Sequence, residues 1–188
     1  MKKVKLVLMI WLAGFTAFSQ SITVESDKNL NADFSDIKTF GFSSQVDDRL
    51  DPGLYFLNDL TFKSDIRQAV EAELMGLGYT KATSEPDMLV NFRVFDQPVT
   101  IKGFEGLGTT YWTGSSVRDP ESATEYDVKA GTLMVHLVNR KTGELIWQGF
   151  ASGLIDNDKF IKDEVKVREA VSMIFDEFGK RATEYTRK

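Results

Sequence analysis

The feature that most constrains the fold is a pair of segments whose apolar residues recur at steps of three and four, the period of a helix with one buried face. A helix of this kind must pack its apolar face against another element, and a sheet is the usual partner in a two-layer protein. Gly78 follows the first segment, at the point where a left-handed cap favours glycine. The apolar positions are Phe62, Ile66, Ala69, Val70, Leu74 and Leu77 in the first segment, and Val167, Ala170, Val171, Ile174, Phe175 and Phe178 in the second.

Two of the other segments, residues 22–25 and 88–95, place apolar residues at alternate positions, as strands with one buried face do. Within residues 88–95, Val90 and Phe92 fall on one face, whereas Asn91 and Arg93 fall on the other. Strands are predicted at residues 22–25, 39–42, 88–95, 131–139 and 145–151. Strands and helices do not alternate strictly along the chain. This order favours an α+β fold, with a four- to five-stranded, largely antiparallel sheet and two amphipathic helices packed on one face.

The N-terminal residues have the organisation of a secretory signal peptide. Three lysines precede a thirteen-residue apolar run that ends at Phe18, and the small residues Ala17 and Ser19 match the spacing that signal peptidase recognises. Such a run is too short to span a bilayer core of roughly 30 Å, and an uncleaved membrane anchor is the alternative interpretation. We therefore expect a signal peptide over residues 1–19 and a single α+β domain over residues 20–188. The mature domain is expected in the periplasm or cell envelope, with no transmembrane segment.

Charge and cysteine content exclude several classes of partner and chemistry. Removal of the three leader lysines changes the formal charge of the chain from −5 to −8. A charge of this sign argues against nucleic acid as a partner and against bulk attraction to anionic lipid. The chain has no cysteine, which excludes disulfides, thiol catalysis, thiolate metal sites and a lipid anchor attached through cysteine.

Residues 97–126 show no clear period, and we expect an irregular segment there. Its glycines do not follow the order of a dinucleotide-binding loop, and no helical pattern comes after them. Long irregular segments in compact domains are usually functional or disordered, and aromatic residues supply contact area at low entropic cost. We therefore predict that Phe104, Tyr111 and Trp112 form an interaction surface. The alternative is a longer hairpin in which "VTIKGF" pairs with "TTYWTG".

His136, the single histidine of the chain, lies in the predicted strand at residues 131–139. If residues 140–143 form the turn, Asn139 pairs with Glu144 and His136 lies opposite Trp147. A one-residue bulge would exchange the two faces of this hairpin. In the simple register the core face carries Leu133, Val135, Leu137, Ile146 and Phe150, and the other face carries Met134, His136, Val138 and Leu145.

No catalytic, metal-binding or cofactor-binding residue is assigned from the sequence. A catalytic histidine needs an orienting acid and a reacting group within about 3 Å, and no motif supplies either, so His136 is interpreted as a strand residue that packs on Trp147. One histidine without cysteine is a poor donor set for structural zinc. Asp156-Asn-Asp158 resembles the start of a calcium loop, but Val167 stands where an EF-hand requires glutamate.

Four stretches together resemble the domain-of-unknown-function 4136 family of bacterial envelope proteins. They are "ADFSDIKTFGF", "IRQAVEAELMGLGY" with "PDMLVNF" after it, "GTLMVHLVNRKTGELIWQGFA" and "VREAVSMIFDEFG". The resemblance implies an exported protein, often lipid-anchored, with no established activity. This chain lacks the cysteine for such an anchor. His136 stands where the family more often has an acidic residue, so the resemblance does not support a catalytic histidine.

These observations favour a non-catalytic binding or scaffolding module of the envelope, with an envelope protein or a glycan as its partner and no cofactor. The first alternative is a carboxylate-dependent hydrolase of envelope polymers, which requires a pocket with a carboxyl group of perturbed pKa. The second is a small-lipid carrier, which requires an enclosed apolar cavity. The oligomeric state is left open.

Overall fold

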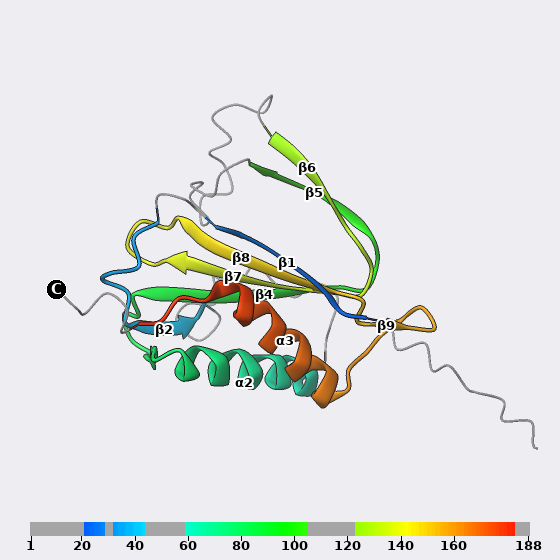
Figure 1. Ribbon diagram of the computed structural model, residues 1–188, viewed down its shortest axis with the longest axis horizontal. Coiled ribbons are helices and arrows are strands. Elements are labelled where there is room, and N and C mark those ends of the chain that lie inside the picture. Colours follow the sequence, from blue (N-terminus) through cyan, green and yellow to red (C-terminus); the bar gives the residue numbers. More distant parts are fainter. Residues whose placement is uncertain (1–20, 29–31, 44–58, 105–122, 183–188) are drawn as a thin grey trace, which may run out of the picture.

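A computed structural model describes residues 21–28, 32–43, 59–104 and 123–182. In these residues six strands form one mixed sheet, and two helices cover one of its faces (Figure 1). In spatial order the strands are β1 (Thr23–Lys28), β8 (Leu145–Ser152), β7 (Thr132–Asn139), β4 (Met88–Phe95), β2 (Thr39–Phe42) and β3 (Thr80–Lys81). The helices are α2, Leu60–Gly76, and α3, Glu164–Phe178. The expected α+β class and the helical layer on one face are confirmed.

The sheet differs from the expectation in size and direction. It has six strands instead of four or five, because the two-residue strand β3, which was not predicted, extends the edge beyond β2. β2 runs parallel to both β3 and β4, whereas the other neighbouring strands are antiparallel. Helix α2 lies between β2 and β4 in the chain and returns it to the starting end of the sheet, so parallel pairing follows from the crossover.

Each helix begins at an aspartate that caps its first turn. The Asp59 carboxylate accepts a hydrogen bond from the Phe62 amide at 3.1 Å, and the Asp163 carboxylate accepts one from the Lys166 amide at 3.0 Å. The Lys162 ammonium lies 2.8 Å from the Asp59 carboxylate, so one ion pair links the starts of the two helices. The predicted glycine after the first helix is confirmed, since Gly78 has a φ of 90°.

The core lies between the helices and the sheet. All predicted stripe residues of both helices are buried there except Leu77, which packs partly buried against the same cluster. Trp147 of β8 packs on Phe175 and Phe178 of α3, with ring centroids 5.9 and 5.1 Å away. The indole lies across the backbone of Gly149, where an added Cβ would come within 2.7 Å of Ile174 Cγ2 and closer still to the indole.

The register of the β7–β8 hairpin corrects one prediction. Asn139 pairs with Glu144 as expected, through a 2.9 Å bond from the Asn139 amide to the Glu144 carbonyl. The register then shifts between Leu137 and Val138, because β8 contains one extra residue at that point. As a result, His136 lies opposite Gln148, and Trp147 lies opposite Leu137.

This shift changes the face of β8 side chains beyond the bulge. The expected core positions Leu133, Val135, Leu137 and Ile146 are in the main core, together with Trp147. Phe150, predicted to be in the core, lies instead on the other face with Phe95, Val128 and Met134. The predicted packing of His136 on Trp147 is therefore wrong.

The segment after β4 is not wholly irregular. Val99–Phe104 forms β5 and Ala123–Val128 forms β6, and the two pair in antiparallel register from Val99↔Val128 to Phe104↔Ala123. "VTIKGF" is thus a strand, as the alternative interpretation held, and its partner among the described residues is "ATEYDV"; the predicted partner "TTYWTG" lies outside those residues. β5 continues β4 and β6 leads into β7, so the two pairs form one long hairpin with a bend between its halves.

Figure 1 shows the β5–β6 half standing away from the sheet, on the side opposite the helices. Gly131 occupies the bend with a φ of 75°, and an added Cβ there would lie 2.7 Å from Ile155 Cβ and 2.9 Å from the Leu154 carbonyl carbon. Its amide donates to the Phe95 carbonyl and its own carbonyl accepts from the Leu154 amide. A residue with a side chain does not fit this position, so the bend depends on glycine.

A small hairpin of β9, Ile155–Asp156, and β10, Lys159–Phe160, follows the main sheet. Asn157 and Asp158 form its turn with positive φ, so the "DND" sequence serves as a tight turn. In the described ranges, neither helix is both long enough and apolar enough to cross a membrane.

Candidate functional site

The face of the sheet opposite the helices carries a mixture of polar and apolar side chains, and we call it the open face. Directly paired residues on neighbouring strands share a face. Asn91, His136 and Gln148 are paired in this way across β4, β7 and β8. The next row on the same face contains Arg93, Met134 and Phe150.

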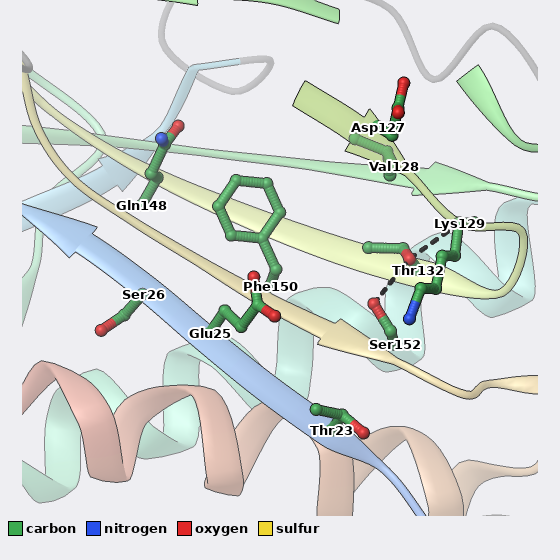
Figure 2. A pocket seen from close by; sticks show the side chains of 10 residues that line it. All are labelled: Thr23, Glu25, Ser26, Asp127, Val128, Lys129, Thr132, Gln148, Phe150 and Ser152. Atoms are coloured by element: carbon green, nitrogen blue, oxygen red, sulfur yellow. Dashed lines mark hydrogen bonds between the residues drawn. The ribbon is translucent and has the colours of Figure 1, made fainter. Parts of the chain in front are cut away.

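A cleft of about 420 Å³ lies on the open face, between β1 and β8 on one side and the lower end of β6 on the other (Figure 2). Its volume is in the range of small-molecule and peptide-sized pockets. It is lined by Thr23, Glu25, Ser26, Asp127, Val128, Lys129, Thr132, Gln148, Phe150 and Ser152. The cleft exists because the bend at Gly131 carries β6 over strands that are distant in the sequence.

Hydrogen bonds fix the wall of the cleft near the bend. The Thr132 hydroxyl donates to the Lys129 carbonyl at 2.8 Å and lies 2.9 Å from the Ser152 hydroxyl (Figure 2). The Thr100 hydroxyl donates to one oxygen of Asp127 at 2.8 Å. The Thr132 bonds link the residue after β6 to the start of β7 and the end of β8, whereas the Thr100–Asp127 bond links β6 to β5.

The floor of the cleft combines one aromatic ring with charged groups. Phe150 is half-buried and packs on Phe95, Val128 and Met134. Figure 2 shows its ring rising from β8 with the Glu25 side chain near its base, and Asp127 on the opposite wall. The arrangement offers hydrogen-bond acceptors, donors and one apolar contact at the same place, which suits recognition of a polar ligand with an apolar group.

His136 pairs with the cleft residue Gln148 on the open face but does not itself line the cleft. Burial lowers the pKa of His136 from 6.5 to about 3, and the nearby Arg93 guanidinium acts in the same direction. The imidazole is therefore neutral at physiological pH. A base with so low a pKa takes up a proton poorly near pH 7, which is unfavourable for general base catalysis.

Two donors on the open face lack acceptors among the described residues. They are Nδ2 of Asn91, a residue only 4% exposed, and Nε of Arg93. A buried donor without a partner costs about 1–3 kcal/mol. The open face therefore carries two buried donors that the described residues do not satisfy.

A second pocket, of about 460 Å³, lies at the end of the sheet where β2 and β4 begin and the β7–β8 turn returns. Arg140 forms a 3.2 Å ion pair with Glu85 at its rim. The Asp87 carboxylate accepts hydrogen bonds from the Lys38 amide and from the amide and hydroxyl of Thr39, at 2.8–3.0 Å. Asp87 therefore joins β2 to β4, and its role there is structural.

The carboxyl groups with shifted pKa values do not resemble the acid of a hydrolase. Burial raises the pKa of Asp87, but its hydrogen bonds from Thr39 and Lys38 outweigh that effect and lower it. A backbone hydrogen bond from Ser35 lowers the pKa of Asp33, and a hydrogen bond from Lys162 lowers that of Asp59. A general acid requires a raised pKa, so these three groups are in the wrong state for that role.

The predicted interaction surface is only partly reached by the structure. Phe104 is the last residue of β5, opposite Ala123, and its side chain is not described. Tyr111 and Trp112 lie outside the described residues. Within the described ranges, no group of three or more His, Asp or Glu side chains is arranged to hold a metal ion.

Sequence reasoning missed the cleft. Its lining residues come from β1, β6, β7 and β8, and each strand contributes polar residues of the kind that ordinary exposed strand faces carry. The one local signal is the alternation of Gln148, Phe150 and Ser152, which places a large aromatic residue on a polar face. That signal depends on the register, and the bulge conceals it.

Comparison with known proteins identifies the family. The model of a domain of unknown function, DUF4136, matches residues 24–178. A DUF4136 family protein from Bacteroides thetaiotaomicron has a similar structure, with 17% identity and a TM-score of 0.54, over 84% of this chain and 95% of that chain. At this level of identity the similarity establishes the fold alone. The search of curated proteins found no match.

Two further solved structures match this chain at lower similarity. A PDZ domain protein from Parabacteroides distasonis has 15% identity and a TM-score of 0.48. The match covers 84% of this chain but only 36% of that chain. A PelC dodecamer from Paraburkholderia phytofirmans has 10% identity and a TM-score of 0.42, over 86% of this chain and 99% of that chain.

Proposed function

This chain belongs to the DUF4136 family, whose function is unknown, and from that membership and the geometry of its open face we propose that it is a non-catalytic binding module of the bacterial cell envelope. The partner is an envelope component that binds in the cleft between β1, β8 and β6. The observation that carries the proposal is the cleft itself, which combines Glu25, Asp127, Lys129 and the half-buried Phe150 in a volume of about 420 Å³.

The composition of the cleft favours binding over the two alternatives. A lipid carrier requires an enclosed apolar cavity, whereas eight of the ten residues that line this cleft are polar or charged, the exceptions being Val128 and Phe150. A hydrolase requires a proton donor, and the shifted carboxyl groups of the described residues have lowered pKa values. The unpartnered donors of Asn91 and Arg93 on the same face add to its polar character.

The envelope location rests on the N-terminal sequence. The leader lysines, the apolar run to Phe18 and the small residues at Ala17 and Ser19 support export and cleavage. The intact mass of protein recovered from the periplasmic fraction of a Gram-negative host should correspond to a chain that starts at Gln20. Recovery of the full-length chain in the membrane fraction would contradict export with cleavage.

Site-specific photo-crosslinking in cells tests whether the open face is the binding face. A photoreactive phenylalanine analogue replaces Phe150 in the cleft, and in a matched control it replaces Met75, which is 56% exposed on helix α2. We expect a discrete crosslinked product from position 150 and none of the same mass from position 75. Equal labelling at both positions, or none at position 150 in the folded protein, would contradict the proposal.

A further inference from the structure

The cleft has the shape of a site for an extended polypeptide. Resting on the proposed function, we propose that the envelope partner contributes an extended segment that pairs with β6 and adds a third strand to the β5–β6 ribbon. The side chains of that segment alternate, so that a basic residue meets Glu25 and Asp127 while an apolar residue contacts Phe150. This mode of recognition is β-augmentation, in which main-chain hydrogen bonds provide affinity and pockets select alternate side chains.

The first observation is the position of the β6 edge. Within the described residues, β6 pairs with β5 alone. β6 leads into β7, which pairs with β8 on the side away from β4, so the other edge of β6 lies on the β8 side. β8 ends at Ser152, which lies level with Thr132 at the start of β7. β8 therefore does not continue alongside β6. The amides and carbonyls along this edge of β6 are therefore positioned to pair with another strand.

The second observation is the way in which β6 and the bend line the cleft. Side chains of a strand point alternately to opposite faces, so a ligand that touches one face meets every second residue. The cleft is lined instead by the last two residues of β6, Asp127 and Val128, and by Lys129, which follows the strand. Consecutive lining residues indicate that the edge of the chain, with its main-chain groups, borders the cleft.

The third observation concerns the side chains around that edge. Glu25 and Asp127 are exposed carboxylates that line the cleft from β1 and from β6, and Lys129 is the single cation among the lining residues. Asp127 accepts one bond from Thr100, and a carboxylate has capacity for several more. The excess of negative charge favours a segment that carries lysine or arginine. The Phe150 ring, on the floor below the β6 edge, offers a contact for an apolar side chain.

The experiment selects ligands from a phage-displayed library of random nine-residue peptides, using the folded mature chain as bait. The selected peptides are then synthesised, and their affinities are measured by calorimetry against the wild type and a Glu25→Gln/Asp127→Asn variant. Asp156→Asn, at the exposed end of β9, is the control for a general change of charge. Each peptide is also made with alternate backbone amides N-methylated, which removes main-chain donors and leaves the side chains in place.

We expect enrichment of sequences with alternating apolar and basic residues, a loss of at least tenfold in affinity for the Glu25→Gln/Asp127→Asn variant, and no change for Asp156→Asn. N-methylation can fall on the odd-numbered or on the even-numbered amides of the peptide, and one of these two versions should fail to bind. Hydrogen exchange of the β6 amides that do not face β5, measured by NMR, should slow when the peptide is bound. Side-chain recognition without strand addition would leave these amides unprotected.

The outcomes separate this inference from the proposed function. If no peptide is selected, or if N-methylation in both registers is tolerated, strand addition is wrong. The proposed binding function remains supported in that case if the photo-crosslink from position 150 identifies another ligand, such as a glycan. If the chain itself supplies the strand, light scattering will show concentration-dependent dimers that the N-methylated peptide does not disrupt, and the partner assigned here would be wrong.

Discussion

The two faces of the sheet are built on different physical principles, although the same strands form both. The helix-covered face is a continuous apolar core in which helix stripes, aromatic rings and close backbone contacts fit together. The open face places Asn91, His136 and Gln148 side by side and leaves buried donors without partners among the described residues. Burial of apolar surface stabilises the first face, whereas polar groups on the second contribute little unless something binds them. This difference is what the proposed function requires, in which one face maintains the fold and the other binds the partner.

The strongest test of this contrast is a charge placed on either side of helix α3. Val171 is fully buried against the sheet, whereas Val165 in the same helix is 71% exposed. Val171→Asp should reduce the free energy of unfolding by about 3–5 kcal/mol, because an unpaired carboxylate enters an apolar interface. Val165→Asp, the matched control, should change it by less than about 0.5 kcal/mol. Urea denaturation followed by circular dichroism measures both values.

Val70→Asp on α2 should behave like Val171→Asp, since Val70 is also fully buried. If either core variant has the denaturation midpoint of the wild type, the assignment of the helix faces is wrong.

A smaller effect should come from one methyl group added where the core approaches the backbone most closely. Gly149→Ala brings a Cβ into contact with Trp147 and Ile174, and overpacking of this kind costs about 1–3 kcal/mol. Gly76→Ala in the last turn of α2 is the control, because no atom lies within 4 Å of the added Cβ and alanine favours helix. The control should be stabilised by up to about 1 kcal/mol in thermal unfolding. Equal melting temperatures for Gly149→Ala and the wild type would show that the indole moves freely, and the helix-covered face would then be less tightly packed than we infer.

The helix-covered face was largely predictable from the sequence, because its signals are local. Two 3.6-residue stripes and the alternation within Met88–Phe95 specify which side chains point inward, and the structure places them there. The end of the first helix also followed ordinary capping chemistry, as Gly78 shows.

The open face was not predictable, because its geometry depends on two events without a local signature. The extra residue in β8 moves Trp147 into the core and Phe150 out of it, and no sequence pattern indicated which register would win. The bend at Gly131 then brings Asp127 across from Glu25, although about a hundred residues separate them in the chain. A glycine permits such a bend but does not by itself specify one.

The histidine provides a test of the open face that depends on pH. The pKa of His136 is about 3 in the folded state, whereas an unperturbed histidine has a pKa of 6.5, so the folded chain binds fewer protons than the unfolded chain between these values. The free energy of unfolding should therefore fall as the pH decreases below 6.5, by up to about 1.4 kcal/mol per pH unit. Above pH 6.5 the titration of His136 should not change it. His136→Gln should show a flat profile between about pH 6.5 and 5.

Because His136 is the single histidine of the chain, few other groups titrate in that window. Chemical denaturation at intervals of half a pH unit measures the slope in both proteins. The same slope in the variant and the wild type would show that His136 is accessible to protons in the folded state, contrary to its burial on the open face.

The smallest expected effect on stability is also the one that separates recognition from folding. Glu25→Gln/Asp127→Asn removes both carboxylates of the cleft but keeps the shapes of the side chains, and the amide oxygen introduced at position 127 still accepts the Thr100 hydroxyl. Both residues are exposed, and surface substitutions away from caps and core contacts change stability by at most about 0.5 kcal/mol. The urea midpoint of the double variant should therefore match that of the wild type, whereas Val171→Asp should be largely unfolded at that urea concentration.

A decrease of more than about 1 kcal/mol in the free energy of unfolding of the double variant would mean that the two carboxylates hold the β5–β6 ribbon against the sheet. In that case the open face would also maintain the fold, and its charged residues would need no ligand to account for them.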